Sequence, residues 1–422
     1  MKKLPILGFL LLAAFAFASG QKEQQSINLT LLLEAYPEER KEAVSEFLTE
    51  NPNVSVEVKL VDLSDGSTLT MDAMLAAGTA PNVYLDYMGR ISKYIVPEFA
   101  LSLGKYMSDL NDYKPGILDP VTRDGQVLAL PQTGNAQGMS LNLNMFTELG
   151  EAVPTNATWT VDNFLRLSGK VKSKYGGEKY GTGMFAANQS GDYLYMNWLS
   201  SFGAEIYADG YIKTVIKSPQ GLYVFDFWKS IYDKGYIEKE SPVLTDDDYV
   251  LSWAQGKYLA TAFFPAWVAT YQKTALEQGL IKEPHKFSFV RFPAAPGISK
   301  VPATTNYGGI VVKKTDDEKI NKASARLAWY MNNKEMQEKR IKLLEIGNRK
   351  SVTVKNDDPY WQQIAVIVDQ NGTLDLGLTT PYFSAVRTQM FPRLQAMWTG
   401  KETPAEALAK YETEVNNILR GE

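Results

Sequence analysis

Hydrophobic and polar positions follow two different periods along the first quarter of the chain. Residues 27–33 are mostly apolar, and residues 54–60 alternate apolar with polar side chains, as β-strands do. Between them, apolar residues recur at a spacing near 3.6, which predicts a helix that starts after Pro37 and ends at Asn51-Pro52. The same periods predict a second helix over 68–77 and a third strand over 82–86. This alternation of strands and helices predicts an α/β fold with a parallel, doubly wound sheet.

Ligands of such sheets bind beyond the carboxyl ends of the strands. Here those ends carry Glu34, Tyr36, Asp86 and Tyr87. These four residues are therefore candidates for a binding site.

The chain opens with the pattern of an export signal. Lys2 and Lys3 precede an apolar stretch over Leu4–Ala18, and the polar run Gln21–Gln25 follows it. This stretch is shorter than the roughly 20 apolar residues that span a bilayer. We expect residues 1–20 to be a signal peptide cleaved after Ala18 or Gly20; an uncleaved signal acting as a tether is the alternative.

Composition excludes several kinds of chemistry. A length of 422 residues favours two domains, and the net charge of −4 without basic clusters argues against nucleic acid as a partner. The chain has no cysteine and a single histidine, His285. Disulfides, thiol nucleophiles, a lipid-bearing cysteine, histidine triads and two-histidine metal sites are therefore excluded.

Other motifs are better explained by structure than by chemistry. Asp246-Asp247-Asp248 lacks the spacing of a calcium loop and is typical of a helix start. Capping boxes at Thr315 and Thr403 predict two further helices. No phosphate-binding loop or nucleophile elbow occurs, whereas a pair of carboxylates for glycoside hydrolysis remains possible among 48 acidic residues.

Six short segments occur in a characteristic order: Leu75–Val83, Val127–Pro131, Leu141–Phe146, Pro154–Phe164, Trp253–Trp267 and Pro381–Arg387. Together they resemble the extracellular solute-binding proteins of ABC importers, in the maltose-binding-like family (family 1) of sugar receptors. Three departures stand out. Asn82 replaces the usual aspartate, one extra residue precedes Trp267, and Leu141–Phe146 lacks the family's aromatic pair, which hints at a different ligand.

The resemblance implies a two-lobed periplasmic-binding-protein fold, each lobe a doubly wound sheet flanked by helices, with a ligand cleft between the lobes. Both lobes are discontinuous: 27–133 with 292–357, and 134–291 with 358–422. Hinge strands are expected near Pro131–Gly138 and Phe289–Pro293, with a third crossing near Asp357.

The implied function is capture of a mono- or oligosaccharide for the permease subunits of an ABC importer in the inner membrane, without catalysis, cofactor or metal. Because no cysteine can carry a lipid, we expect a monomer free in the periplasm. A receptor for a non-sugar solute, such as a phosphorylated polyol or a cationic metabolite, is one alternative, and a secreted carboxylate-based glycan-degrading enzyme is another.

Family position and local sequence together suggest a pocket with aromatic and polar parts. The expected stacking surfaces are Tyr193, Trp198, Trp267, Tyr382 and Phe383. The expected polar and flanking groups are Glu34, Tyr36, Asp86, Tyr87, Asn135, Gln137, Asn306, Tyr307 and Arg349. Arg349 has a second interpretation, as a structural ion pair across the lobes; if it reaches the cleft, it permits an anionic ligand.

Overall fold

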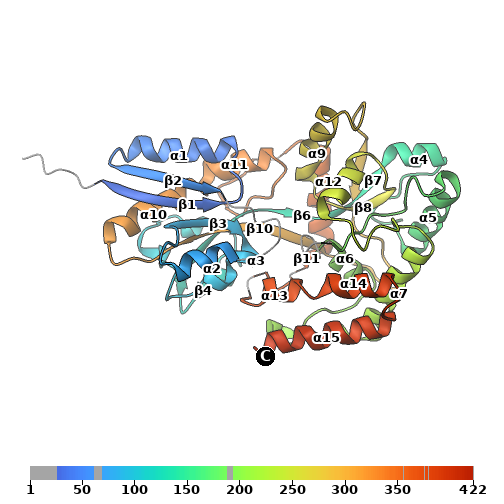
Figure 1. Cartoon of the computed structure of the whole chain (residues 1–422). Coiled ribbons are helices and arrows are strands. Elements are labelled where there is room, and N and C mark those ends of the chain that lie inside the picture. The colour runs from blue at the N-terminus through green and yellow to red at the C-terminus, as the bar shows by residue number, and fades with distance from the viewer. Residues whose placement is uncertain are drawn as a thin grey trace, which may run out of the picture.

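The computed structural model describes residues 26–60, 69–187, 193–354, 356–374, 376–378 and 380–421. The predicted signal, residues 1–20, lies outside them. Among the described residues, no helix combines the length and apolarity needed to cross a membrane. Figure 1 shows two lobes joined by extended strands.

The N-terminal lobe is built on a six-stranded mixed sheet. Its strands are β1 (Ile27–Leu33), β2 (Val54–Leu60), β3 (Val83–Tyr87), β6 (Ala129–Ala136), β10 (Ala303–Val312) and β11 (Thr373–Leu374). Its helices are α1 (Glu38–Glu50), α2 (Leu69–Ala76), α3 (Met88–Ile91), α10 (Glu318–Tyr330) and α11 (Lys334–Lys342), and β4 (Thr122–Arg123) and β5 (Gln126–Val127) form a separate hairpin.

Helices cover both faces of this sheet because successive strand residues point to opposite sides. Leu31 and Leu33 pack in a core with residues of α1 and α10, whereas Leu32 packs in a second core with residues of α2 and α3. Strand β1 pairs in parallel with both β2 and β3, which confirms the predicted strand–helix–strand order.

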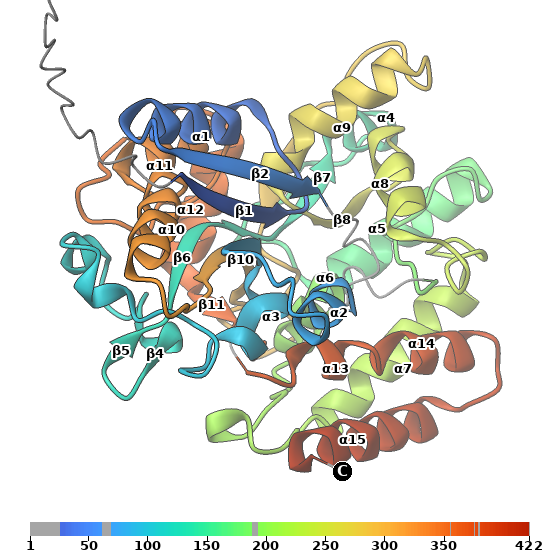
Figure 2. The ribbon, with the colours of Figure 1, turned by 60° about the vertical axis from the view of Figure 1, so that its left-hand side comes forward.

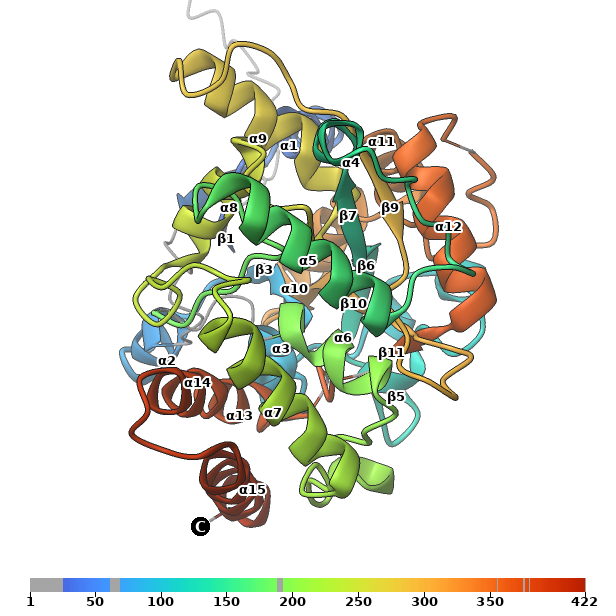
Figure 3. The same cartoon turned by 90° about the vertical axis from the view of Figure 1, so that its right-hand side faces the viewer.

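The C-terminal lobe has a smaller sheet and more helices, which surround the sheet in Figure 3. Its strands are β7 (Gly138–Asn142), β8 (Ala260–Phe263) and β9 (Phe287–Val290). Its helices are α4 (Leu143–Leu149), α5 (Val161–Tyr175), α6 (Tyr193–Ser201), α7 (Pro219–Asp233), α8 (Asp246–Ala254), α9 (Pro265–Glu277), α12 (Pro359–Asn371), α13 (Phe383–Arg387), α14 (Met390–Trp398) and α15 (Pro404–Arg420). Helices α14 and α15 pack side by side along one edge (Figure 2).

This second sheet differs from the expected doubly wound one. Both β8 and β9 pair antiparallel with β7, so the described strands form a three-stranded antiparallel sheet. One large aromatic core joins the sheet to the helices around it.

The chain crosses between the lobes on two long paired strands. Strand β6 leads into β7, and the ten-residue β10 returns antiparallel to β6. The second crossing therefore lies later than the predicted Phe289–Pro293. Phe289 and Val290 pair entirely with β7, and Phe292 stays in the core of the C-terminal lobe.

Of three helix starts predicted from polar residues, two are confirmed and one is wrong. Thr245 and Asp248 form a capping box at α8, which confirms the structural interpretation of the aspartate run, and Thr403 and Glu406 cap α15. The box predicted at Thr315 is wrong: Asp317 caps α10, because its side chain accepts from the backbone N–H of Lys319.

Candidate functional site

A cavity of about 180 Å³ lies at the carboxyl ends of β1 and β3, where the crossing strands pass. Six of the predicted site residues line it: Glu34, Asp86, Tyr87, Asn135, Asn306 and Tyr307. The strand ends point toward the C-terminal lobe in both Figure 1 and Figure 2. Chain segments far apart in sequence therefore meet at one place, as expected of a doubly wound sheet.

The carboxylate of Asp86 is fully occupied by its own lobe. It accepts hydrogen bonds from the hydroxyl of Tyr84 (2.6 Å), the backbone N–H of Tyr87 (2.6 Å) and the guanidinium of Arg90 (2.7 Å). Burial lowers the pKa of Arg90, but the carboxylates of Asp86 and Glu34 outweigh this and raise it. Asp86 is therefore part of the cavity wall, and its carboxylate is not available as a hydrogen-bond acceptor for a ligand.

Glu34 is the accessible carboxylate of the pair. Its side chain is 51% exposed and lies 3.3 Å from Nη2 of Arg90. A carboxylate held in this way accepts hydrogen bonds from hydroxyl groups.

Two amide side chains face the cavity from the crossing strands. Asn135 on β6 lies directly opposite Asn306 on β10 in the strand register, so both point to the same face. The Oδ1 atom of Asn135 is buried and has no hydrogen-bond partner among the described residues. A buried acceptor of this kind is costly unless a ligand or water satisfies it.

The ring of Tyr87 is held at the cavity edge by the C-terminal segment. It packs edge-on against Phe383 at 5.7 Å, and the guanidinium of Arg387 lies 5.9 Å from it. Phe383 itself is buried, whereas its neighbour Tyr382 is 38% exposed. Phe383 therefore supports Tyr87 from behind.

Helix α9 brings aromatic rings from the other lobe. Trp267 packs against Phe264 at 4.7 Å and against Tyr271 at 5.9 Å, and it is only partly buried. Burial, and then the carboxylates of Asp247, Asp246 and Glu34, raise the pKa of Tyr271. Since Glu34 belongs to the N-terminal lobe, α9 lies within electrostatic reach of the cavity.

Three predicted residues are fully buried away from the cavity. Trp198 is only 2% exposed and packs against Phe227, Phe164 and Phe292, so its ring belongs to the core. Gln137 is 1% exposed and accepts hydrogen bonds from Asn197 and Thr304. Its carboxamide therefore links helix α6 to the crossing strand β10.

Arg349 is the third of these. It is 1% exposed, its Nη1 lies 2.8 Å from Oδ2 of Asp109, and its guanidinium lies 4.5 Å from the ring of Tyr113. The ion pair is therefore structural, but it lies within the N-terminal lobe and not across the lobes as expected. Tyr36 packs at the edge of the N-terminal core. Tyr193 begins α6, and its side chain is outside the described residues.

Five polar side chains of the cavity were missed: Arg40, Gln132, Thr133, Arg340 and Glu345. Tyr271 was missed as well, although its position four residues after Trp267 places both on one helix face. Nothing in the local sequence indicates that the charged residues line a cavity, because α1, β6 and the α11 region meet only in the folded chain.

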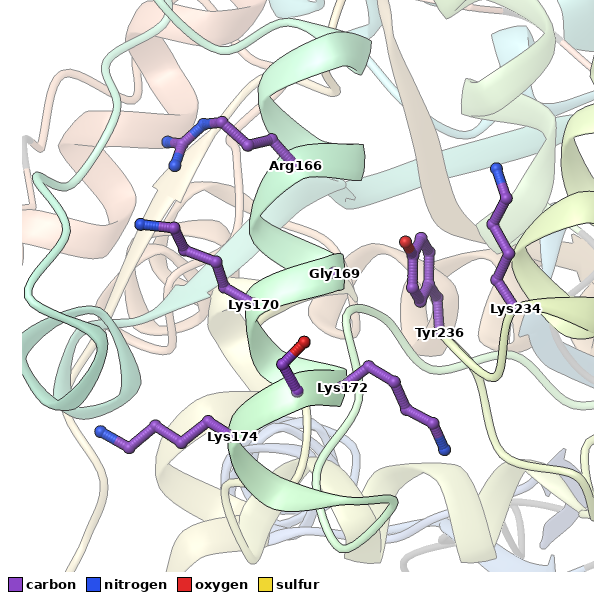
Figure 4. A pocket seen from close by; sticks show the side chains of 8 residues that line it. Arg166, Gly169, Lys170, Lys172, Lys174, Lys234 and Tyr236 are labelled. Carbon is purple, nitrogen blue, oxygen red and sulfur yellow. The ribbon is translucent and has the colours of Figure 1, made fainter.

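A larger hollow, of about 680 Å³, lies along α5 on the C-terminal lobe. In Figure 4 the charged ends of Arg166, Lys172 and Lys234 point in different directions and do not converge. Arg166 is already paired with Glu151 at 2.9 Å. This hollow has the features of a solvated basic surface. Among the described residues, no group of acidic or histidine side chains is arranged to hold a metal ion.

Comparison with known proteins agrees with this architecture. Residues 42–365 match the sequence profile described as bacterial extracellular solute-binding protein. Among solved structures, maltose-bound MalE3 of T. maritima superposes with a TM-score of 0.76 at 17% identity, over 92% of this chain and 99% of that one. An ABC transporter solute-binding protein of Thermotoga lettingae, bound with α-D-tagatose, gives 0.76 at 20% identity, over 93% and 100%.

A chitin oligosaccharide binding protein gives a TM-score of 0.78 at 17% identity, over 94% of this chain and 100% of that one. No curated protein matches the chain in sequence. At these identities the solved structures establish the two-lobed fold, and the profile, which covers most of the chain, establishes the family. The chain belongs to the bacterial extracellular solute-binding proteins.

Proposed function

We propose that this protein is the substrate-binding component of an ABC importer and that it captures a carbohydrate between its lobes. The observation that carries the proposal is the meeting of Asn135, Asn306 and Glu34 with the ring of Tyr87 in one cavity. Tyr271 of α9 lies within electrostatic reach of Glu34. A sugar ring has an apolar CH face and a rim of hydroxyls, so aromatic rings beside short polar side chains suit it.

The solved structures of the same fold add support. One holds maltose, another holds α-D-tagatose, and the third is a chitin oligosaccharide binding protein. Closure of the lobes over the ligand would present one surface to the permease. We further propose export by residues 1–20 and a monomer free in the periplasm, which the mass of the mature protein and size-exclusion chromatography test.

Binding without turnover is part of the proposal. Hydrolysis of a glycoside needs two available carboxyl groups. In this cavity Asp86 is held by Arg90 and Tyr84, and Glu345 is held by Arg340 and Thr133. Analysis of a bound sugar after prolonged incubation should therefore recover it unchanged. A hydrolysis product that disappears when Glu34 is replaced by Gln would favour the enzyme instead.

A thermal-shift screen of mono- and oligosaccharides tests the ligand class. A sugar present at 100 times its Kd should add about 2.7 kcal/mol to the free energy of unfolding. Titration calorimetry on each hit then gives the stoichiometry, which we expect to be one. If no carbohydrate shifts the melting temperature while a non-sugar metabolite does, the proposal is wrong.

A further inference from the structure

Three arginine side chains lie at or beside the cavity. Arg40 from α1 and Arg340 from α11 line it, and Arg90 lies behind its wall. Whether each guanidinium already has a counter-ion decides what kind of ligand the cavity favours.

Two of the three are neutralised by the protein. Arg90 is paired with Asp86 at 2.7 Å. Arg340 donates from Nε to Oε2 of Glu345 at 2.7 Å and to Oγ1 of Thr133 at 2.9 Å. Both guanidinium groups therefore have carboxylates at contact distance.

Arg40 differs from both. Its Nη1 donates to the backbone carbonyl of Ala35 at 2.7 Å, while its Nε is buried without a hydrogen-bond partner. Within the described part of the chain, no carboxylate lies within 4.0 Å of this guanidinium. A guanidinium without a carboxylate at contact distance in a partly enclosed cavity is the more unusual arrangement.

The surroundings of Arg40 also favour an anion. Burial and the neighbouring Arg340 lower the pKa of Arg40 to about 10, although Glu345, Glu39 and Glu34 partly offset this. The residue lies in the first turn of α1, whose N-cap, Pro37, provides no side-chain cap. Unsatisfied N–H groups at a helix start add positive potential at the same place.

We infer that the solute carries an anionic group and that Arg40 binds that group in the cavity. Because this rests on the proposed function, the ligand class becomes an acidic sugar: a hexuronate unit, or a sugar phosphate with the same charge. Arg40 supplies the counter-ion, while Asn135 and Asn306 bind hydroxyl groups.

The test compares three sugars that differ in one group: a neutral hexose, the matching hexuronate and the hexose phosphate. Calorimetry of the wild-type protein should show at least tenfold tighter binding of one of the two acids than of the hexose. That preference should fall as salt is raised, as expected of a contact between charges. This measurement needs no variant.

Two variants then locate the charge. Arg40→Gln should abolish the preference for the acid and change hexose affinity by twofold or less, whereas Arg40→Lys should keep most of it. The matched control is Arg326→Gln on α10, which pairs with Glu50 at the far end of α1 and should leave the preference intact. Melting temperatures confirm that each variant is folded.

Each outcome has one meaning. Preference for the hexuronate or for the phosphate, lost in Arg40→Gln, supports the inference and identifies the acidic group. Equal or tighter binding of the neutral hexose, or a preference that survives Arg40→Gln, overturns it and leaves the proposed function standing. Failure of all sugars to bind overturns the proposed function instead.

Discussion

Asn135 and Asn306 lie directly opposite each other on the two strands that cross between the lobes. Their carboxamides therefore point to the same side, toward a cavity in which Oδ1 of Asn135 has no partner among the described residues. The pair is placed where the two lobes meet, so a ligand bound there contacts the element that links them.

Replacing either amide should weaken binding without unfolding the protein. We expect Asn135→Ala and Asn306→Ala each to lower ligand affinity by about fivefold, since one neutral hydrogen bond contributes roughly 1 kcal/mol. Calorimetry with the ligand found by screening measures this. Asn28→Ala, on the outer part of β1 where Asn28 accepts from Ser55, serves as the control and should bind normally. Unchanged affinity in both cavity variants would place the ligand elsewhere.

The two tryptophans first considered for stacking should behave in opposite ways. Trp198→Ala removes a ring packed against three phenylalanines and should cost about 3–5 kcal/mol of stability. Trp267→Ala removes a partly buried ring on α9 and should mainly weaken binding, by about tenfold. Urea unfolding and calorimetry on both variants separate the effects. A Trp267 variant with normal affinity and lower stability would show that this ring only packs.

Glu238 should make stability fall as pH rises. Burial raises the pKa of this carboxyl, although hydrogen bonds from Tyr258 and Ser252 and the charge of Lys257 oppose the shift. The folded state therefore favours the protonated form. Its contribution is fully present below the unfolded pKa, near 4.5, and is lost as pH rises through the higher folded pKa.

Glu238→Gln should accordingly raise the melting temperature at neutral pH and have little effect near pH 4. Melting curves of both proteins across this range test the sign. Glu205→Gln, on the exposed surface of the same lobe, is the control. A variant less stable than the wild type at pH 7 would contradict the expectation.

Arg349 should matter for folding rather than for the ligand. Its removal leaves the carboxylate of Asp109 without a guanidinium, although Trp329 still donates to it, and opens space beside Tyr113. Arg349→Met should therefore cost about 3 kcal/mol. Ligand affinity should stay within twofold of the wild type. Arg326→Met, a surface pair with Glu50, should change stability by less than about 1 kcal/mol. Lost affinity at unchanged stability would return Arg349 to the binding site.

Local patterns predicted local structure well. The order from β1 to β3 follows from periodicity alone, and the bounds of β1 and β2 agree with the expected ranges, because each element depends on neighbours in sequence. The position of β10 does not follow from periodicity, because its pairing with β6 and β3 depends on chain segments far upstream. A crossing at residues 289–293 was therefore a reasonable but wrong prediction.

The same limit applies to the cavity. Glu34 and Asp86 follow from their places at strand ends, whereas Arg40, Arg340 and Glu345 come together only through packing of α1 against the α11 region. Trp198 shows a second limit. An aromatic residue on a helix has the same sequence pattern whether it faces a core or a ligand, and only tertiary packing distinguishes them.

The pairing of β10 with β3 has a consequence for how the chain acquires its structure. Gly309 aligns with Asp86, so the first sheet lacks an inner strand until more than two hundred further residues have been synthesised. Contacts between such distant segments fold slowly, since a long loop must close before they contribute. Nascent chains that end before β10 should therefore remain protease-sensitive, and native protection should appear only once that strand is available.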